Sequence, residues 1–553
     1  MKKSLLVLFG IFLICGLVSC TGSTGKTNGN GGSTIVDDSS TVEPVTDTSI
    51  SAEETTSAFS MTTEDGEYTI SNNVYSITKA GTYSLSGYLN GQILVDITEG
   101  DVVLELNGVT IEYNQDSPIK IVSADNVDLS AKKDTENVIK DTRNTKVVED
   151  ENQGEGAISA KADLKLKGTG VLVVTGNYNN GIHTTKDLTI QKLSLKVTAY
   201  NNAIKGKDSI EIKSGSIVAI STNGDGVETT NTDADKNGVT RGDITLYGCA
   251  LTVYAAGDGI QSAHNFTMAA SDDGSTPNVT IYTGSYSGYT ASTASTTSYK
   301  GIKVQNELNI NAGTITISSY DDGLHADYGT KFDAGGTGAG TINISGGKVV
   351  MAVYSPAGKT GGGRVGPGSW GNQQSVKGAD AIHADYKLNI SGGYIEIDSS
   401  YEGLEANLIT ISGGETYVVA NDDGVNACSG PVSIPQVVVT GGYLDVTVSP
   451  NGDTDGIDSN GKYTQSGGVV ITRGPSSEMA AAIDADSSVS ITAGTLIILG
   501  YGNVSRGSGV STYNLSLHSS GSHTVKIDGV SYSFNNNYSY GKTTIYSSVK
   551  VTN

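Results

Sequence analysis

Apolar and polar residues alternate along most of this chain in short runs, the pattern of strands with one buried face. The stretch 403–425 is typical, with Leu-Ile-Thr-Ile and Glu-Thr-Tyr-Val-Val-Ala separated by Ser-Gly-Gly and followed by Asn-Asp-Asp-Gly. The Gly-Gly and Asp-Gly steps provide corners at which φ can be positive. Patterns long enough for helices are nearly absent, so the sequence predicts an all-β protein.

One short phrase, Asp-Gly-Ile-x-Ala or a close variant, recurs and defines a repeat of about 22 residues. Longer steps between copies fit one repeat plus an insertion. The longest step, from Leu324 to Ile382, holds one further strand pair and two Gly-rich inserts at 328–339 and 355–378. The apolar residue of the phrase, which we call position 0, is Ile158, Ile182, Ile204, Val227, Ile260, Ile302, Leu324, Ile382, Leu404, Val425, Ile457 and Ile483.

Three short strands in each repeat are too few for a closed globule, but stacked repeats bury a continuous aliphatic column. We therefore predict a right-handed parallel β-helix, a solenoid of roughly twelve coils spaced ~4.8 Å apart, with β caps at both ends. A β-sandwich is the alternative, but it gives no reason for the period. We expect a signal peptide at 1–20, a flexible tether at 21–60, an N-terminal cap with irregular first coils at 61–150, the β-helix at 151–519 and a C-terminal cap at 520–553.

The N-terminus has the features of an export signal. Lys2 and Lys3 precede an apolar run from Leu5 to Val18 that is too short to span a membrane comfortably. The run ends in Leu-Val-Ser-Cys20, which resembles a bacterial lipobox and would make Cys20 the lipidated first residue; a cleaved signal with a coincidental cysteine is the alternative. The Ser/Thr/Gly-rich segment that follows predicts a tether. We expect an exported protein, exposed at the cell surface and held to the membrane only by this anchor.

Composition narrows the function. The net charge of −23 argues against nucleic-acid binding and against adsorption to anionic lipid. With 72 Gly, 6 Phe and 1 Trp among 553 residues, the core must consist of small and β-branched side chains. Four cysteines are too few for a disulfide scaffold, and Cys249 and Cys428 are expected to be packing residues.

Stacking of the repeats would place acidic residues of successive coils one rung apart. Relative to position 0, position −2 lies at a corner and position +1 points outward. Two carboxylates ~4.8 Å apart repel by roughly 3–4 kcal/mol at an effective dielectric constant near 20, and Ca²⁺, whose ligand oxygens can lie ~5 Å apart, would relieve this. The alternative is that acids at −2 are turn formers that bind local backbone. We predict a Ca²⁺ site among Glu402, Glu405, Asp423, Asp455, Asp458 and Asp484.

The insert 355–378 suggests where a sugar could bind. It contains Arg364 and the only tryptophan, Trp370, and it could flank a groove with Tyr320 and Tyr401. Sugars pack on aromatic faces, and carboxylated sugars pair with Arg and Lys. A plain Gly-rich loop is the alternative.

Lys303 and the histidines are further candidates for functional residues. Lys303 is a candidate for sugar binding or for the base of a lyase. The alternative is a structural role, in which Lys303 forms a salt bridge with neighbouring acids. The six histidines have no metal-ligand spacing, and we expect His325 and His383 to be stacked, exposed neighbours.

The phrases together resemble a family of bacterial surface proteins with carbohydrate-binding β-helix domains, over roughly 60–520. This resemblance implies a right-handed β-helix similar to pectate lyases, bound Ca²⁺, and affinity for cellulose and polygalacturonate-like sugars without demonstrated cleavage. The chain departs from the pattern at Ala381 and Ala481. The phrases are Tyr299-Lys-Gly-Ile-Lys, Asp321-Asp-Gly-Leu-His-Ala, Asp380-Ala-Ile-His-Ala-Asp, Ser400-Tyr-Glu-Gly-Leu-Glu-Ala, Asp422-Asp-Gly-Val-Asn-Ala and Asp455-Gly-Ile-Asp-Ser-Asn-Gly.

We therefore predict a monomeric cell-surface lipoprotein that binds plant-type polysaccharide in a calcium-dependent or calcium-stabilised manner and does not cleave it. The ligand would be polygalacturonate, another acidic glycan, or cellulose. Two alternatives remain: a calcium-dependent pectate lyase, which would use a lysine as base, and a surface adhesin or structural stalk in which the repeats only span distance.

Overall fold

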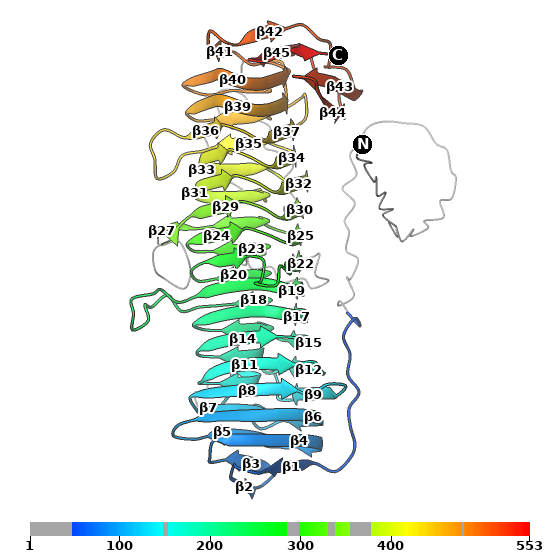
Figure 1. Cartoon of the computed structure of the whole chain (residues 1–553), viewed down its shortest axis with the longest axis vertical. Helices are drawn as coiled ribbons and strands as arrows, with labels where there is room; N and C mark the ends of the chain where they lie inside the picture. Colours follow the sequence, from blue (N-terminus) through cyan, green and yellow to red (C-terminus); the bar gives the residue numbers. More distant parts are fainter. Residues whose placement is uncertain (1–46, 147–152, 285–297, 330–337, 354–377, 478–479) are drawn as a thin grey trace, which may run out of the picture. The chain divides into compact units, whose positions relative to one another are not determined.

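The computed structural model describes residues 47–553 except 147–152, 285–297, 330–337, 354–377 and 478–479. The described residues form no α-helix, and 41 strands join one sheet in which nearly all pairs are parallel. The all-β prediction is confirmed. Figure 1 shows the strands stacked in successive layers, with the chain advancing from β3 to β40. None of these residues forms a helix with the length and apolarity that a membrane span needs.

The recurring phrase returns to one column, as predicted. Leu404 pairs with Val425, and Val425 pairs with Ile457, each in parallel register. The same pairing links every position 0 from Ile158 to Ile457. The strands of this first column are β3 (Val74–Ile77), β5 (Gln92–Asp96), β7 (Ile119–Ser123), β10 (Gly156–Ala160), β13 (Asn180–Thr184), β16 (Ile204–Gly206), β18 (Val227–Glu228), β20 (Ile260–Ser262), β23 (Ile302–Val304), β26 (Leu324–Ala326), β31 (Ile382–Ile390), β33 (Leu404–Ile411), β35 (Val425–Ala427) and β38 (Ile457–Ser459).

Two further columns complete each repeat, and several long strands belong to both the second and the third. The second contains β4 (Gly81–Asn90), β6 (Asp101–Tyr113), β8 (Asn126–Ala131), β11 (Asp163–Gly168), β14 (Asp187–Gln191), β17 (Ser209–Ser221), β19 (Asp243–Ala255), β21 (Phe266–Met268), β24 (Glu307–Ile310), β29 (Thr341–Ile344), β36 (Gln436–Val439), β39 (Lys462–Arg473) and β40 (Ser488–Leu499). β31 and β33 continue from the first column into the second, where they lie between β29 and β36. The third column adds β9 (Glu136–Asp141), β12 (Val171–Gly176), β15 (Leu193–Ala199), β22 (Asn278–Thr283), β25 (Thr314–Ser319), β30 (Lys348–Val353), β32 (Tyr394–Ser399), β34 (Glu415–Val419) and β37 (Tyr443–Thr447). Their inward side chains form one continuous, largely aliphatic core.

The longest insertion leaves the columns intact. Leu324 pairs directly with Ile382, although 58 residues separate them along the chain. The strand pair expected between them is present as β29 and β30, while most of the two Gly-rich inserts lies outside the described residues. The short strands β27 (Tyr328–Gly329) and β28 (Gly338–Ala339) form a separate antiparallel pair within the first insert.

The glycine at position −1 is explained by close stacking. A Cβ on Gly424 would lie 2.1 Å from Val446 Cγ1 and 2.7 Å from the carbonyl oxygen of Gly456 in the next repeat. A Cβ on Gly403 would meet Val418 Cγ1 at 2.2 Å. The phrase therefore carries glycine because a core side chain and the next backbone occupy the space of a Cβ.

At each end of the stack, antiparallel strand pairs cover the parallel columns. At the N-terminal end β1 (Ser60–Thr63) pairs with β4, and β2 (Tyr68–Ser71) pairs with β3. At the C-terminal end β45 (Thr543–Ser547) pairs with β40, and a small separate sheet packs beside it over a second apolar cluster. The remaining strands are β41 (Ser505–Arg506), β42 (Ser511–Tyr513), β43 (Gly521–Ile527), β44 (Val530–Asn536) and β46 (Val551–Thr552).

Part of the segment expected to be a tether contacts the stack. Of residues 21–60, the structure describes 47–60. Ile50 is buried against Val218 and Ile220 on the outside of β17. Residues 47–60 are therefore in contact with the sheet, and 21–46, like the signal segment and Cys20, lie outside the described residues.

Candidate functional site

Position −2 carries a hydrogen-bond ladder. The side-chain oxygen of one −2 residue accepts the backbone N–H of the −2 residue in the next repeat, as between Asp225 and Asp258 at 2.8 Å. The acids and amides at −2 thus bind backbone, as the alternative interpretation expected, but that backbone belongs to the neighbouring repeat. One oxygen of each carboxylate on the ladder is used in this way, and its second oxygen remains for other partners. Further rungs join Asn180 to Asn202 (3.2 Å), Asn202 to Asp225 (2.8 Å), Asp258 to Lys300 (2.7 Å), Asp322 to Asp380 (2.9 Å), Asp380 to Glu402 (3.2 Å) and Asp423 to Asp455 (2.7 Å).

The C-terminal part of this ladder holds acids that no ion pair of the described residues joins to a cation. Burial, followed by the charges of Asp422, Asp455 and Asp458, raises the pKa of Asp423 to about 8, although the N–H of Asp455 opposes the shift. Burial and neighbouring acids raise the pKa of Asp455 to about 7 and that of Asp458 to about 6. Burial and the charge of Asp380 raise the pKa of Glu402 well above its ordinary value.

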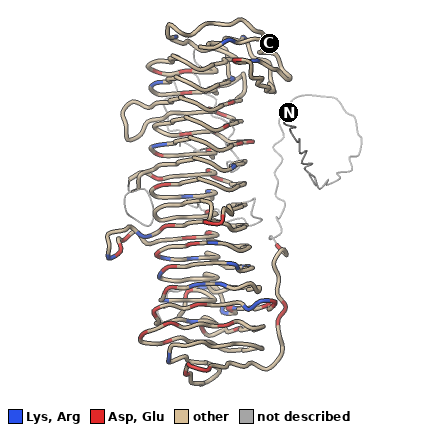
Figure 2. The backbone as a smooth tube through the Cα atoms, in the orientation of Figure 1, with Lys and Arg blue, Asp and Glu red and all other residues tan. Residues whose placement is uncertain are grey.

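Figure 2 places acidic residues on successive turns of this part of the chain. Among the ion pairs of the described residues, none joins a lysine, arginine or histidine to Glu402, Asp423, Asp455, Asp458 or Asp484. We call these five residues the acidic column.

Glu405, predicted as part of the same site, belongs to a different cluster. Its Oε2 lies 3.0 Å from His383 Nδ1. Burial alone would raise the pKa of Glu405, but the hydrogen bond and charge of His383 lower it to about 2. Stacking therefore splits the six predicted ligands, with Glu405 neutralised by His383 and the acidic column left unneutralised.

Two copies of Asp-x-x-His-x-Asp stack on β26 and β31 and form a buried cluster of histidines and acids. In the first copy, His325 Nδ1 lies 2.8 Å from Asp322 Oδ2, and its Nε2 lies 3.1 Å from Asp327 Oδ1. In the second, His383 Nδ1 lies 3.1 Å from Asp380 Oδ2, and its Nε2 lies 3.4 Å from Asp385 Oδ1. Each ring thus has a carboxylate at both nitrogens.

The two histidine rings stack, with centroids 4.8 Å apart and planes 20° from parallel. The predicted stacking is confirmed, but the predicted exposure is wrong, because His325 is only 7% exposed and His383 only 9%. The judgement that the histidines lack metal-ligand spacing is also wrong. Ligand atoms of Asp322, His325 and His383 all lie within 4.8 Å of one another, and so do those of Asp380, His383 and Glu405. The available signal was the repetition of the same phrase in two repeats that stack.

Burial alone would lower the pKa of His383. Hydrogen bonds to Asp380, Asp385 and Glu405 instead hold this pKa well above its ordinary value. Beside the cluster, Lys300 Nζ lies 2.9 Å from Asp322 Oδ2 and 3.0 Å from Asp321 Oδ2. The cluster is therefore a dense network of opposite charges, unlike the acidic column.

The predicted sugar-binding residues are only partly described. Trp370 and Arg364 lie outside the described residues. Tyr320 and Tyr401 occupy corners immediately before the −2 region of their repeats, and burial and a hydrogen bond to Asp422 raise the pKa of Tyr401. Lys303 is 8% exposed and lies between Gln261 and His325 in the +1 column. Burial raises the pKa of Asp258 although the charge of Lys303 opposes the shift, whereas the hydrogen bond and charge of His325, with a smaller contribution from Lys303, lower the pKa of Asp327 against the effect of burial.

The same outer column is basic near its other end, which the sequence interpretation missed. Lys120, Ser159, His183 and Lys205 follow one another in register at +1. The first three line a groove of about 350 Å³. Burial, together with the charge of Lys205, lowers the pKa of His183 to about 4.

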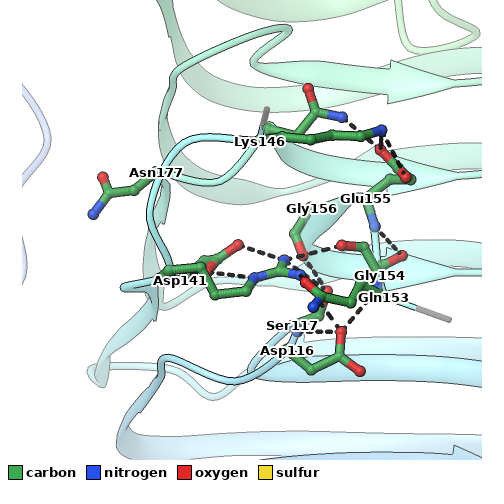
Figure 3. Close-up of polar contacts among 12 residues, drawn as sticks. Asp116, Ser117, Asp141, Lys146, Gln153, Gly154, Glu155, Gly156 and Asn177 are labelled. Atoms are coloured by element: carbon green, nitrogen blue, oxygen red, sulfur yellow. Dashed lines mark hydrogen bonds and ion pairs between the residues drawn. The ribbon is translucent and has the colours of Figure 1, made fainter. Parts of the chain in front are cut away.

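A buried arginine, Arg143, binds residues beside this groove; Figure 3 shows its partners Asp141, Gln153 and Gly154. The Arg143 guanidinium donates to Asp141 through Nε at 2.9 Å and Nη2 at 2.6 Å, and to the carbonyl of Gly154 at 2.9 Å. The side chain of Asp141 is fully buried, and the guanidinium also lies over the Tyr178 ring at 3.9 Å. These contacts tie residues 142–146 and 153–155 to the stack, which indicates a structural role.

Comparison with known proteins gives the family. A family model described as "carbohydrate-binding domain-containing protein" matches residues 71–355, just over half of the 553-residue chain. The chain belongs to this carbohydrate-binding domain family. The predicted resemblance is confirmed at this level, and the matched span ends before the acidic column.

A relative of the same description from Acetivibrio thermocellus is 39% identical over 132 residues, which are 23% of this chain and 44% of the relative. The match thus spans less than half of that protein's length. A solved structure of a polysaccharide lyase-like protein from C. thermocellum, a gadolinium derivative, is 31% identical. It covers 45% of this chain and 90% of its own, with a TM-score of 0.38.

Proposed function

We propose that this protein is a calcium-stabilised, carbohydrate-binding lipoprotein that holds polysaccharide at the bacterial cell surface without cleaving it. Family membership supports a carbohydrate ligand. The fold that accounts best for the three parallel columns is a right-handed parallel β-helix of roughly twelve coils. The observation that carries the calcium proposal is the acidic column: the part-buried carboxylates of Asp423 and Asp455 have raised pKa values, and no ion pair of the described residues joins the column to a cation.

The chemistry of the acidic column fits Ca²⁺. This ion takes six to eight oxygen ligands and prefers carboxylates, and the column offers only oxygen donors. The hydrogen bonds of Asp423 and Asp455 to the next repeat occupy one oxygen each, so that the second oxygen is available. Glu402, Asp423, Asp455, Asp458 and Asp484 lie on successive repeats, so Ca²⁺ would bind between neighbouring members of this column, whose oxygens can lie ~5 Å apart around one ion. When bound, the cation would neutralise these side chains and attract the carboxylates of a uronate ligand, which reconciles a net charge of −23 with an anionic glycan.

The outer column provides a surface on which a glycan chain could lie. Lys120 and Lys205 at its basic end already pair with Asp116 and Glu228, each at 2.6 Å, so a sugar carboxylate would have to share these cations with protein acids. Tyr320 and Tyr401 precede repeats that are separated by the repeat of Ile382 and, with Trp370 and Arg364, remain our candidates for sugar contacts. Polygalacturonate-like acidic glycans are the ligands that this charge distribution favours, with cellulose as the neutral comparison.

Cleavage has weaker support than binding. A lyase base must reach the sugar and lose its proton near neutral pH. Lys303 is buried, and its charge acts on Asp258 and Asp327. This arrangement supports charge balance as the role of Lys303.

The proposal is tested by retention on insoluble polygalacturonate and on cellulose, each with Ca²⁺ and with a chelator. We expect calcium-dependent retention on polygalacturonate and no rise in the absorbance of unsaturated uronides. The double variant Asp423→Asn, Asp455→Asn should lose the calcium dependence, whereas Asp187→Asn, at an exposed acid of β14, should behave as wild type. Retention that chelator does not change would overturn the calcium proposal, and release of unsaturated uronide would overturn binding without cleavage.

The lipid anchor is tested separately by the full-length precursor expressed in a bacterium. We expect the wild type to take up labelled fatty acid and to fractionate with membranes. Cys20→Ser should be secreted without label. Labelling that persists in Cys20→Ser would contradict the anchor.

A further inference from the structure

The stacked histidines are surrounded by carboxylate oxygens. A neutral imidazole has one N–H donor and one nitrogen lone pair, whereas a carboxylate can only accept. His325 and His383 each face carboxylate oxygens at both nitrogens, at 2.8–3.4 Å. If the rings are neutral, one nitrogen of each directs its lone pair at a carboxylate. If both rings carry a second proton, two cations are stacked with centroids 4.8 Å apart.

The geometry of this cluster also allows a metal ion to be bound by both imidazoles. With the N–H on Nε2, Asp327 and Asp385 act as acceptors that fix the orientation of the rings, an arrangement common around metal-bound histidines. Each Nδ1 then directs its lone pair toward the side that holds Asp322, Asp380 and Glu405. Two imidazole nitrogens and nearby carboxylates are a donor set for Zn²⁺ and similar divalent transition metals, whereas Ca²⁺ prefers oxygen alone.

The ligand atoms are already close together. The sets Asp322–His325–His383 and Asp380–His383–Glu405 each lie within 4.8 Å and share His383. Zn²⁺ held at ~2.0–2.2 Å by several of these atoms requires only small side-chain movements. A second, independent observation is the adjacent Asp327, which is 7% exposed and has one buried oxygen, Oδ2, without a hydrogen-bond partner. This buried polar group belongs to a built site and not to a solvated acidic face.

We propose that Asp322, His325, Asp380, His383 and Glu405 form a binding site for a divalent transition metal, represented by Zn²⁺, with Asp327 and Asp385 as positioning residues. The site is distinct from the acidic column and differs from it in having nitrogen donors. It pins together two repeats that are 58 residues apart along the chain, at the step that carries the longest insertion.

The test is calorimetric titration of Zn²⁺ into the chelator-treated full chain, with Ca²⁺ in excess throughout. We expect one Zn²⁺ per chain. His383→Gln should weaken binding at least ~100-fold, because it removes the ligand shared by both sets, and Asp327→Asn should weaken it ~10–100-fold. Co²⁺ in place of Zn²⁺ should give the ligand-field absorption of a site with nitrogen donors, and this absorption should be lost in His383→Gln.

His264→Gln is the matched control. His264 Nδ1 also faces an aspartate, Asp243 Oδ1 at 2.7 Å, but within the described part of the chain no second histidine ring stacks on His264. This variant should bind Zn²⁺ as wild type does. Absence of Zn²⁺ binding by the wild type, displacement of Zn²⁺ by Ca²⁺, or unchanged affinity in His383→Gln would overturn the proposal. If circular dichroism shows that His383→Gln is unfolded, Asp327→Asn and the Co²⁺ spectrum of the wild type decide the question. Calcium-dependent polygalacturonate binding by the same samples tests the acidic column separately.

Discussion

Asp423→Asn should stabilise the calcium-free protein, increasingly so as the pH rises. Asn keeps the side-chain oxygen that accepts the Asp455 N–H at 2.7 Å and removes the charge. Asn180 and Asn202 occupy the same place in earlier repeats, so the substitution fits the ladder. Burial and neighbouring acids raise the pKa of Asp423 to about 8, so ionisation of this carboxyl opposes folding.

The direction in which pH changes the stability follows from proton linkage. Between an unfolded pKa near 3.8 and a folded pKa of about 8, the folded protein binds the extra proton. The free energy of unfolding therefore falls as the pH rises through this window, and the whole cost is present above it. The difference between the two pKa values corresponds to an upper bound of about 5–6 kcal/mol. Part of the repulsion is shared with Asp455 and screened by solvent, so we expect the advantage of Asp423→Asn to grow by about 2–3 kcal/mol between pH 5 and pH 9.

The assay is urea unfolding of wild type, Asp423→Asn and the exposed control Asp187→Asn, followed by circular dichroism across this pH range in chelator. Added Ca²⁺ should stabilise the wild type more than Asp423→Asn at high pH, because the variant has lost a ligand. Wild type and Asp187→Asn should run in parallel. A calcium-free Asp423→Asn protein that is less stable than wild type at high pH would refute the electrostatic reasoning.

Three further substitutions test the packing and the ladder, each by urea unfolding. Gly424→Ala should lower the free energy of unfolding by about 1–3 kcal/mol, because the added Cβ would clash with a core side chain and with backbone. Gly509→Ala should leave the free energy of unfolding unchanged, because the space around Gly509 is open, and equal effects of the two substitutions would contradict this explanation. Asp141→Ala should lower it by about 3–5 kcal/mol, since it leaves a guanidinium buried without its carboxylate, and a neutral result would exclude that role. Asn180→Ala should lower it by about 1–3 kcal/mol by leaving a buried backbone N–H unpaired, and an unchanged midpoint would contradict the ladder.

The parallel pairing of strands into columns could be predicted because it depends only on the repeat period of the sequence. Residues one repeat apart pair whatever the inserts do, so the pairing of Leu324 with Ile382 follows from the recurring phrase. The glycine at position −1 and the acid or amide at −2 also repeat, and their roles are local consequences of stacking.

The burial and partners of the +1 side chains could not be predicted in this way. Position +1 was expected to face outward, yet His325 and His383 are buried among acids of their own and neighbouring repeats. An outward side chain is exposed only if the corners and side chains of adjacent repeats do not cover it. The repeat period of the sequence carries no information about this cover. The ion pair between Glu405 and His383 could not be predicted for the same reason, because it depends on the side chains of an adjacent repeat. Arg143 and Asp141 lie where the phrase is absent, so no pattern marked their contact.

The most direct test of the central claim is calorimetric titration of Ca²⁺ into the chelator-treated full chain, with the melting temperature measured in parallel. We predict binding heat and a higher melting temperature for the wild type, and the loss of both effects in Asp423→Asn, Asp455→Asn. A wild type that gives no heat and no change in melting temperature would contradict a calcium site on the acidic column.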